Sequence, residues 1–273
     1  MNDDYPEPPP RHSGGLAPNF AGDLTMGLRF YSRVPLASLP FPDEPPELNR
    51  MALALPFVSL LLGAIPALLL IVLTLIGLPG IFAAGLAAIA YLAITGAMSE
   101  DGLADASDGL FGGATATRRL EIMRDSRHGT YGVLALVLFI LLRIVAVGAI
   151  AALHSLGAGA LWLAAMILSR SGSLWLAVVL PPARTDGLSA AVGGVTRPAF
   201  AVGAILALII AAVLAIPVLG PIALLIALAF MVAVAAGWTI CCQRLVGGQT
   251  GDLIGALQAL LELAALTVFL IFA

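Results

Sequence analysis

Four acidic residues gather in a ten-residue stretch, Glu100 to Gly109, which follows a long apolar segment. If the helix of that segment continues, Asp101, Asp105 and Asp108 fall at i, i+4 and i+7 and share one face. Like charges at this spacing repel, so we expect a compensating cation. Carboxylate oxygens suit Mg²⁺, which shares its coordination sphere with substrate phosphates. The three aspartates therefore predict a Mg²⁺ site, against the plainer interpretation of a solvated acidic loop.

Arginines follow the acidic stretch closely. Glycines end the first helix, and we expect a second, short polar helix from about Thr117 to His128. It carries Arg118, Arg119, Arg124 and Arg127. Arginine contacts phosphate with two parallel N–H groups, so carboxylates for a metal beside arginines for phosphate predict phosphoryl transfer. For any single arginine, anchoring at the lipid headgroups is the plainer alternative.

Two further loops carry polar residues next to apolar segments. One is glycine-rich and consists of Gly247, Gly248, Gln249, Thr250, Gly251 and Asp252. Its glycines let backbone N–H groups turn toward an anion, and the following helix adds the positive end of its dipole. The other loop, Pro181 to Gly187, contributes Arg184 and Asp186. We expect both loops to extend the phosphate site.

The elements that must position these residues are apolar helices. Hydrophobic residues make up 60% of the 273 residues and charged residues 11%, against roughly a quarter in soluble domains. A span needs about 20 apolar residues. Seven segments qualify: Met51 to Leu78, Ile81 to Ser99, Tyr131 to Leu153, Ala158 to Leu180, Pro198 to Leu219, Pro221 to Cys242 and Leu253 to Ala273. The sequence predicts an all-α, polytopic membrane helix bundle of about seven transmembrane helices with cytoplasmic connecting helices.

Charge decides the orientation and excludes one class of partner. With 13 basic and 16 acidic residues, a net charge of -3 and no basic tract, nucleic-acid binding is excluded. The connections at 79–80, 154–157 and 220 carry no charged residue, whereas those at 100–130, 181–197 and 243–252 all contain arginine. The positive-inside rule places the arginine-bearing connections in the cytoplasm.

The amino-terminal region is expected to differ from the rest. Residues 1–22 are proline-rich and predict a disordered cytoplasmic tail, which leaves 23–273 as the membrane-embedded domain. The segment Phe20 to Leu39 is too short and too charged to span. An amphipathic segment in the membrane interface and a plain tether are both compatible with it.

Three charged residues lie inside the predicted spans: Arg143, Arg170 and Glu262. Each lies about 15 to 18 Å from the predicted cytoplasmic end of its helix. Because an isolated charge at this depth costs a few kcal/mol, it must pair or line a polar cavity. We expect Glu262 to pair with one arginine while the other faces a cavity open to the cytoplasm. A purely structural ion pair and the pathway of a cation-coupled transporter are the alternatives.

The motifs together resemble the cobalamin synthases, the adenosylcobinamide-GDP ribazoletransferases. The resemblance covers nearly the whole chain from about residue 23. The matching runs are Glu100 to Gly109, Arg119 to Arg127, Gly129 to Gly132, Gly247 to Asp252 with Gly255, Ala256 and Glu262, Phe30 to Pro35, and Pro181 to Gly187.

The resemblance implies transfer of the cobinamide phosphate of adenosylcobinamide-GDP to α-ribazole, or to its 5'-phosphate, with release of GMP. It also implies Mg²⁺ as the cofactor, held by Asp101, Asp105 and Asp108, and a carboxylate base, Asp125 or Asp252. The expected substrate-binding residues are Arg33, Arg118, Arg119, Arg124, Arg127, Arg170, Arg184, Gly247, Gly248, Gln249, Thr250 and Glu262. The implied location is the lipid bilayer of a bacterial inner membrane, crossed several times, with the active site facing the cytoplasm. The sequence is also compatible with a homo-oligomer.

A neighbouring class, the CDP-alcohol phosphotransferases, is the enzymatic alternative. Asp105 to Gly109 matches the start of their Asp-x-x-Asp-Gly signature. The match then fails, because Phe111 to Gly113 stands where Ala-Arg is expected.

Overall fold

The computed structural model describes residues 20–34, 47–184 and 194–273, and the described chain contains helices but no β-strand. The predicted all-α class is therefore confirmed. The predicted tail lies almost wholly outside the described residues, as do Asp186 and Gly187. The helices are α1 (Phe20–Tyr31), α2 (Leu48–Leu75), α3 (Gly80–Thr95), α4 (Met98–Gly112), α5 (Ala116–Ile122), α6 (Thr130–Leu153), α7 (Ser155–Ser173), α8 (Trp175–Val179), α10 (Arg197–Val246) and α11 (Gly251–Phe272).

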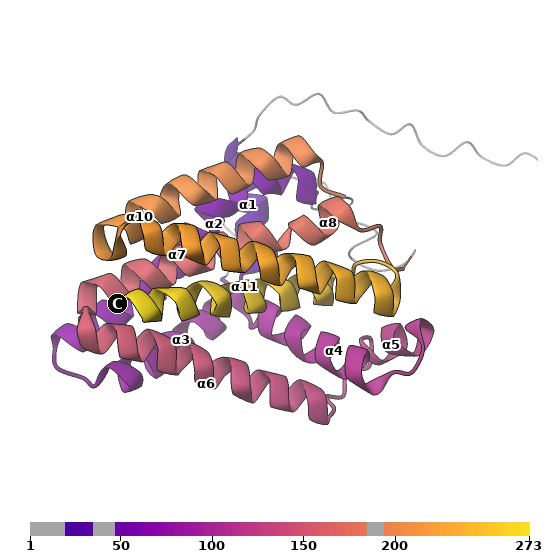
Figure 1. Cartoon of the computed structure of the whole chain (residues 1–273), viewed down its shortest axis with the longest axis horizontal. Coiled ribbons are helices and arrows are strands. Elements are labelled where there is room, and N and C mark those ends of the chain that lie inside the picture. Colours follow the sequence, from indigo (N-terminus) through magenta and orange to yellow (C-terminus); the bar gives the residue numbers. More distant parts are fainter. Residues whose placement is uncertain (1–19, 35–46, 185–193) are drawn as a thin grey trace, which may run out of the picture.

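Long apolar helices make up most of the bundle. Helices α2, α6, α10 and α11, and α7 taken together with α8, are each long and apolar enough to cross a membrane. Helix α10 is two helices joined at Gly220, whose φ of 79° and ψ of 169° are not helical. Its two runs, 197–219 and 221–246, return along each other (Figure 1). The predicted multi-pass bundle is therefore confirmed, and the second run of α10 continues beyond the predicted end at Cys242.

The acidic stretch does not continue the preceding span, so that expectation was wrong. Gly96 and Ala97 both have left-handed backbone angles, with φ of 66° and 57°, and α3 and α4 are bent by 88° at this break. Glycine adopts this conformation freely, whereas alanine is held in it by its surroundings. Helix α3 is left with 16 residues, about 24 Å, which is shorter than a hydrocarbon core of about 30 Å. The aspartates therefore belong to a separate short helix.

Helix α5 is shorter than the polar helix predicted from Thr117 to His128. The Thr115 side chain accepts a hydrogen bond from the Arg118 N–H and caps its start, and the helix ends at Ile122. Residues 123–129 form turns, so Arg124 and Arg127 are not on a helix. The four arginines therefore do not share one helix face: Arg118 and Arg119 lie on α5, and Arg124 and Arg127 lie in the turns after it.

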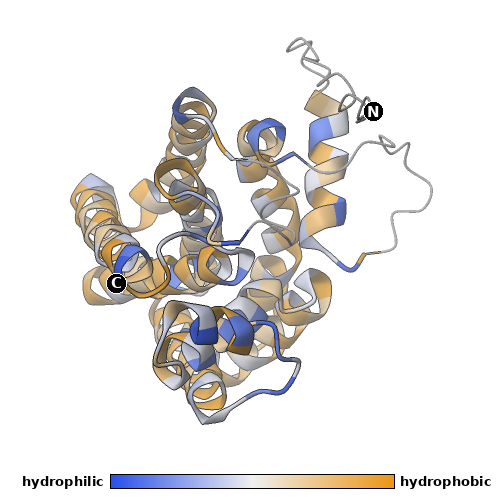
Figure 2. Cartoon of the chain, turned by 90° about the vertical axis from the view of Figure 1, so that its right-hand side faces the viewer, coloured by the Kyte–Doolittle hydropathy of each residue, from blue (hydrophilic) through white to orange (hydrophobic). Residues whose placement is uncertain are grey.

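Helix α11 holds the centre of the bundle and packs against α4, α6, α7 and α10. Helices α4 and α5 lie at one end of the molecule (Figure 1). Figure 2 looks onto that end and shows hydrophilic residues in the segments nearest the viewer. Helix α1 packs on α2 and is tied to it by an ion pair of 3.0 Å between Asp23 and Arg50. A helix thus forms over the first part of the predicted Phe20 to Leu39 segment.

Candidate active site

A cavity of about 220 Å³ lies where α1, α4, α7 and α11 meet. Five residues that the sequence singled out line it together, although they come from four separate segments: Asp101, Arg170, Arg184, Thr250 and Asp252. Hydroxyl and amide groups of Thr95, Ser99, Ser173 and Gln258 complete the polar lining. Phe30, Tyr31 and Leu48 form an apolar part of the wall.

The exposure of the lining side chains distinguishes an outer rim from an inner end. Asp101 is exposed, and the side chains of Asp252 and Arg184 are 28% and 13% exposed. Arg170 and Gln258 are only 2% and 4% exposed. Two carboxylates therefore stand at the rim, and a guanidinium lies at the inner end.

A close approach of α4 to α11 brings the two rim carboxylates together. A Cβ atom on Gly102 would lie 2.9 Å from the carbonyl oxygen of Asp252 and 3.2 Å from its Cα atom. Only glycine allows the two backbones to come this near. Gly102 directly follows Asp101, so this contact sets the position of Asp101 relative to Asp252.

The glycine-rich loop is held against the loop that follows α8. The N–H of Gln249 donates to the Pro181 carbonyl at 2.9 Å, and the N–H of Ala183 donates to the Gln249 carbonyl at 2.8 Å. Gly247 has a φ of 77° and its N–H donates to the Cys242 carbonyl, which ends α10. A side chain on Gly248 would meet the Pro181 carbonyl at 2.5 Å. We expected the backbone N–H groups of this loop to turn toward an anion, but those of Gly247 and Gln249 donate to backbone carbonyls instead. The loop therefore fixes the position of the loop at Pro181 and Ala183.

The two joined loops place Arg184 beside Asp252. The Arg184 guanidinium donates to the Leu120 carbonyl at 2.9 Å and lies 3.9 Å from a carboxylate oxygen of Asp252. Thr250 caps α11 by accepting a hydrogen bond from the Leu253 N–H. The first turn of α11 therefore opens onto the cavity with its positive dipole end and a carboxylate.

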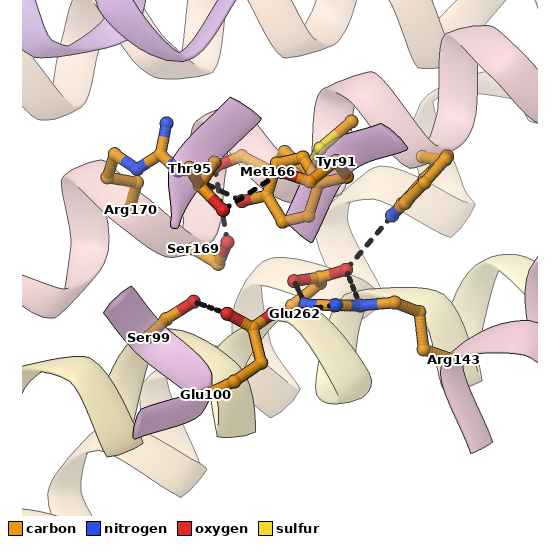
Figure 3. A network of polar contacts seen from close by, with 10 residues as sticks. Tyr91, Thr95, Ser99, Glu100, Arg143, Met166, Ser169, Arg170 and Glu262 are labelled. Carbon is orange, nitrogen blue, oxygen red and sulfur yellow. Dashed lines mark hydrogen bonds and ion pairs between the residues drawn. The ribbon is translucent and has the colours of Figure 1, made fainter. Parts of the chain in front are cut away.

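A buried ion cluster includes Glu100, whose chain neighbours Ser99 and Asp101 line the cavity; Figure 3 shows this cluster. Arg143 donates to both carboxylate oxygens of Glu262 at 2.8 Å and to Glu100 at 2.7 Å. The indole N–H of Trp162 also donates to Glu262, at 3.0 Å. The prediction that Glu262 pairs with one arginine is confirmed. Glu262 is fully buried and is absent from the cavity lining, so its expected role in substrate binding stays a prediction that this geometry does not support.

Arg170 is the arginine that faces the cavity, as expected. It lies beside Thr95 and Tyr91 and away from the carboxylates that Arg143 holds (Figure 3). Its Nη2 atom donates to the Tyr91 hydroxyl at 2.9 Å, and its guanidinium lies 5.3 Å from the centre of the Tyr31 ring.

The three aspartates of α4 do not form one ligand set. The Asp108 carboxylate accepts hydrogen bonds from the N–H groups of Gly129 and Gly132 at 2.6 and 2.8 Å, and so fixes the start of α6. In the described part of the chain, no three His, Cys, Asp or Glu residues are placed to hold a metal ion. The structure thus ties Asp108 to the start of α6, and the Mg²⁺ site expected from Asp101, Asp105 and Asp108 stays a prediction.

The carboxylates at the rim affect the pKa of Asp105. Helix α4 is too short and polar to be a span of its own, and Asp105 lies on it with a side chain that is 19% exposed. Burial, together with the nearby Asp101 and Asp252 carboxylates, raises its pKa from 3.8 to about 7. His128, 3.9 Å away, opposes part of this shift in pKa. The raised pKa indicates that the negative charge here is poorly compensated.

The arginine cluster after α4 does not line the cavity, contrary to expectation. Arg118 pairs with Glu121 at the surface, and Arg119 donates to the carbonyls of Leu110 and Leu245. The remaining expected residues, Arg124, Arg127 and Arg33, are exposed and also absent from the lining.

Asp125 lies outside the cavity as well. Hydrogen bonds from Arg127, the shortest of them 2.7 Å, lower the pKa of Asp125 to about 2. A carboxylate with such a low pKa is a weak base at neutral pH. Asp252, which lines the cavity, is the better placed of the two candidate bases.

Sequence reasoning missed two residues that shape the site. Glu100 was counted with the acidic stretch, but its carboxylate points into the core and pairs with Arg143. Gln258 lines the inner end of the cavity. A pattern in the last span could have identified it: Gly251, Gly255, Gln258 and Glu262 lie at i, i+4, i+7 and i+11, and form a small and polar stripe on one helix face.

Comparisons with known proteins agree with this picture. Residues 23–270 match the cobalamin-5-phosphate synthase family. An adenosylcobinamide-GDP ribazoletransferase of Azorhizobium caulinodans is 43% identical over 96% of this chain and 98% of its own length. Proteins of the same name from Brucella ovis and a Sinorhizobium species are 39% and 37% identical, over 90% and 92% of this chain and 95% and 97% of their own lengths. No solved structure matches significantly.

Proposed function

Since the chain belongs to the cobalamin-5-phosphate synthase family, we propose that it is an adenosylcobinamide-GDP ribazoletransferase and that the reaction takes place in this cavity. The hydroxyl oxygen of α-ribazole, or of its 5'-phosphate, forms a bond to the cobinamide-side phosphorus. The bond from that phosphorus to the bridging oxygen breaks, and GMP leaves with the bonding electrons. The products are adenosylcobalamin, or its 5'-phosphate, and GMP.

One observation carries the proposal: the cavity joins two carboxylates with two guanidinium groups at the start of a long helix. Carboxylates hold the metal ions that accompany phosphates, and guanidinium groups and helix starts bind phosphate oxygens. Asp101 and Asp252 supply the first kind of group, and Arg170 and Arg184 the second. This combination is the equipment of phosphoryl transfer.

The residues of the rim fit Mg²⁺. This ion is commonly held by one or two carboxylates and completes its coordination with water and substrate phosphates, so a group of three protein ligands is not required. Asp101 and Asp252 would hold it, and the nearby Asp105 adds negative charge. When bound, Mg²⁺ would stabilise the charge that develops on the leaving phosphate.

The chain's own residues account for the remaining steps. Asp252 accepts the proton of the attacking hydroxyl, because it lines the cavity, whereas Asp125, the other candidate base, lies outside it. Arg184 holds that carboxylate in place and offers donors to phosphate oxygens. The apolar wall formed by Phe30, Tyr31 and Leu48 excludes water, which would otherwise compete with the hydroxyl.

The orientation in the membrane is part of the proposal. The cavity rim lies at the end of the bundle that carries α4, α5 and the arginine-bearing connections, and the positive-inside rule assigns that end to the cytoplasm. We therefore place the protein in the bacterial inner membrane with its active site facing the cytoplasm, where nucleotide substrates are available.

A turnover assay tests the function. Purified protein is mixed with Mg²⁺, adenosylcobinamide-GDP and α-ribazole, and the release of GMP and of cobalamin is followed. We expect turnover that EDTA abolishes and added Mg²⁺ restores. Asp101→Asn and Asp252→Asn should each reduce kcat at least about a hundredfold. Asp125→Asn, an aspartate outside the cavity, is the matched control and should retain wild-type turnover.

The same assay decides against the alternatives. Activity on a CDP-alcohol without GMP release would indicate a CDP-alcohol phosphotransferase, and no turnover of any kind would reopen the transporter interpretation. The family match favours the transferase, as does a polar cavity lined by α4 and by the start of α11.

A further inference from the structure

Arg170 is buried at the inner end of the cavity and has hydrogen-bonding capacity left over. Its side chain is almost fully buried, with 2% of the residue exposed. One terminal nitrogen donates to the Tyr91 hydroxyl at 2.9 Å, and the other reaches Ser59 at 3.5 Å. The Nε atom has no hydrogen-bond partner among the described residues. A buried N–H without a partner is costly, so this donor calls for a ligand.

The charge of Arg170 is also uncompensated. The two carboxylates buried nearby, Glu100 and Glu262, are both engaged by Arg143 at 2.7 and 2.8 Å. Within the described residues, no ion pair joins Arg170 to a carboxylate, and its nearest compensation is the ring of Tyr31. A buried charge inside a membrane bundle is normally paired. Among the described residues, the protein therefore supplies no anion that pairs with Arg170.

The surroundings of Arg170 favour an anion as well. The start of α11 opens onto the same cavity through Gly251 and Asp252, and the 22 residues of this helix direct its positive dipole end there. Gln258 adds a neutral amide at the inner end, whereas the Ser173 hydroxyl already donates to the Arg170 carbonyl at 2.9 Å. At the rim, Arg184 and the helix start stand beside the carboxylate of Asp252, whereas Arg170 is the charged lining residue at the inner end.

We propose that the inner end of the cavity is a binding site for a phosphoryl group, in which the Arg170 guanidinium supplies the positive charge and hydrogen-bond donors to a non-bridging oxygen. A neutral acceptor would satisfy the hydrogen bond but would leave the charge uncompensated. The identity of the phosphate rests on the proposed function, under which it is the diphosphate of the substrate. The phosphate of a lipid headgroup offers the same chemistry. The apolar part of the wall, where α1 and α2 contribute Phe30, Tyr31 and Leu48, would accommodate the acyl chains of such a lipid.

Binding of inorganic diphosphate without Mg²⁺ tests the site without relying on turnover. The full-length protein in a neutral detergent is titrated while its unfolding temperature is followed by tryptophan fluorescence. We expect diphosphate to raise the unfolding temperature of the wild type and of Arg197→Gln, an exposed arginine outside the cavity. Arg170→Gln should lose this shift. A shift that persists in Arg170→Gln would overturn the proposal.

The unliganded proteins give a second readout. Glutamine at position 170 keeps an amide donor for the Tyr91 hydroxyl but removes the uncompensated charge. Without ligand, Arg170→Gln should therefore unfold at or above the wild-type temperature, whereas a purely structural arginine would make this variant less stable. If Arg170→Gln does not fold, Arg170→Lys decides: about tenfold weaker diphosphate binding supports the site, and unchanged binding overturns it.

Lipid nanodiscs distinguish the two sources of phosphate. Stabilisation by phosphatidylglycerol over phosphatidylcholine that depends on Arg170, with no response to diphosphate, would identify a headgroup as the ligand. A wild type that responds to neither would overturn the site. Failure of the proposed function looks different, because GMP release would be absent while the binding that depends on Arg170 persists.

Discussion

Arg143 and Arg170 are both buried arginines, yet they differ in what surrounds them. Arg143 is held by two carboxylates and lies 4.3 Å from the centre of the Phe139 ring, whereas Arg170, among the residues that the structure describes, donates to hydroxyl groups and lies near the Tyr31 ring. The sequence predicted that one arginine would pair and the other would face a cavity. It could not say which, because that depends on how α6 and α7 are rotated about their axes against α11.

Removing Arg143 should strongly destabilise the protein. Arg143→Met leaves Glu100 and Glu262 buried without a cation, and breaking a buried ion pair in this way costs about 3–5 kcal/mol. Thermal or denaturant unfolding in detergent measures the loss. Arg118→Met, which removes an ion pair whose side chains are 64% and 57% exposed, should change stability by less than about 0.5 kcal/mol. Equal stability of the two variants would contradict the structural role of Arg143.

The raised pKa of Asp105 predicts a pH dependence. Because its pKa is about 7 in the folded protein and 3.8 as the ordinary value, the folded state binds more protons between these values. Stability from this group therefore falls as pH rises through that window and is lowest above pH 7. Charged Asp105 also attracts a cation, so Mg²⁺ should raise the unfolding temperature more at pH 8 than at pH 6. Asp105→Asn should weaken this difference, and an equal effect of Mg²⁺ at both pH values in the wild type would refute the prediction.

At the scale of the elements, hydropathy located the long apolar helices but not the break before α4 or the end of α5, the two short polar helices. The break at Gly96 and Ala97 escaped detection because alanine favours helices and no proline marks the position. The end of α5 at Ile122 was missed because Met123 and Arg124, which follow it, favour helices. Hydropathy reports which segments avoid water, whereas these bends depend on contacts between segments.

The crossing of α4 over α11 should tolerate no side chain at Gly102. A methyl group there would lie 2.9 Å from the Asp252 carbonyl oxygen and would push the two carboxylates apart. Because misplacement by about 1 Å can cost a hundredfold in rate, Gly102→Ala should reduce kcat by tenfold or more. Gly112→Ala, in the same helix, meets only a side-chain atom of Ile122 at 3.7 Å and is the matched control. Wild-type GMP release by Gly102→Ala would contradict the close approach.

At the scale of the whole molecule, apolar surface and polar chemistry occupy different regions. Large hydrophobic side chains are exposed along α2, α6 and α10, where lipid can cover them, while the polar cavity opens at one end. Composition predicted the membrane, and the distribution of charges among the connections predicted the face that carries them. The cavity could not be predicted in the same way, because its wall combines residues from segments far apart in the sequence.

Labelling of single cysteines tests the orientation of the bundle. In a background with Cys241 and Cys242 replaced by alanine, Thr115→Cys should react with a membrane-impermeant thiol reagent only from the cytoplasmic side. His154→Cys, in the turn between α6 and α7, should react only from the opposite side. Both positions are exposed, so access is not limited by packing. The reverse pattern would invert the proposed orientation.

Helix α11 carries the rim carboxylate Asp252, the inner Gln258 and the ion-paired Glu262 on one continuous backbone. The number of residues between these three side chains therefore fixes how the rim, the inner end of the cavity and the ion cluster lie relative to one another. Insertion of one residue between Asp252 and Gln258 would turn everything beyond it by about 100° relative to the rim. An insertion near Gly220, where the chain only reverses direction, would be absorbed locally. Natural changes in length should therefore be found at the turns and be absent from this helix.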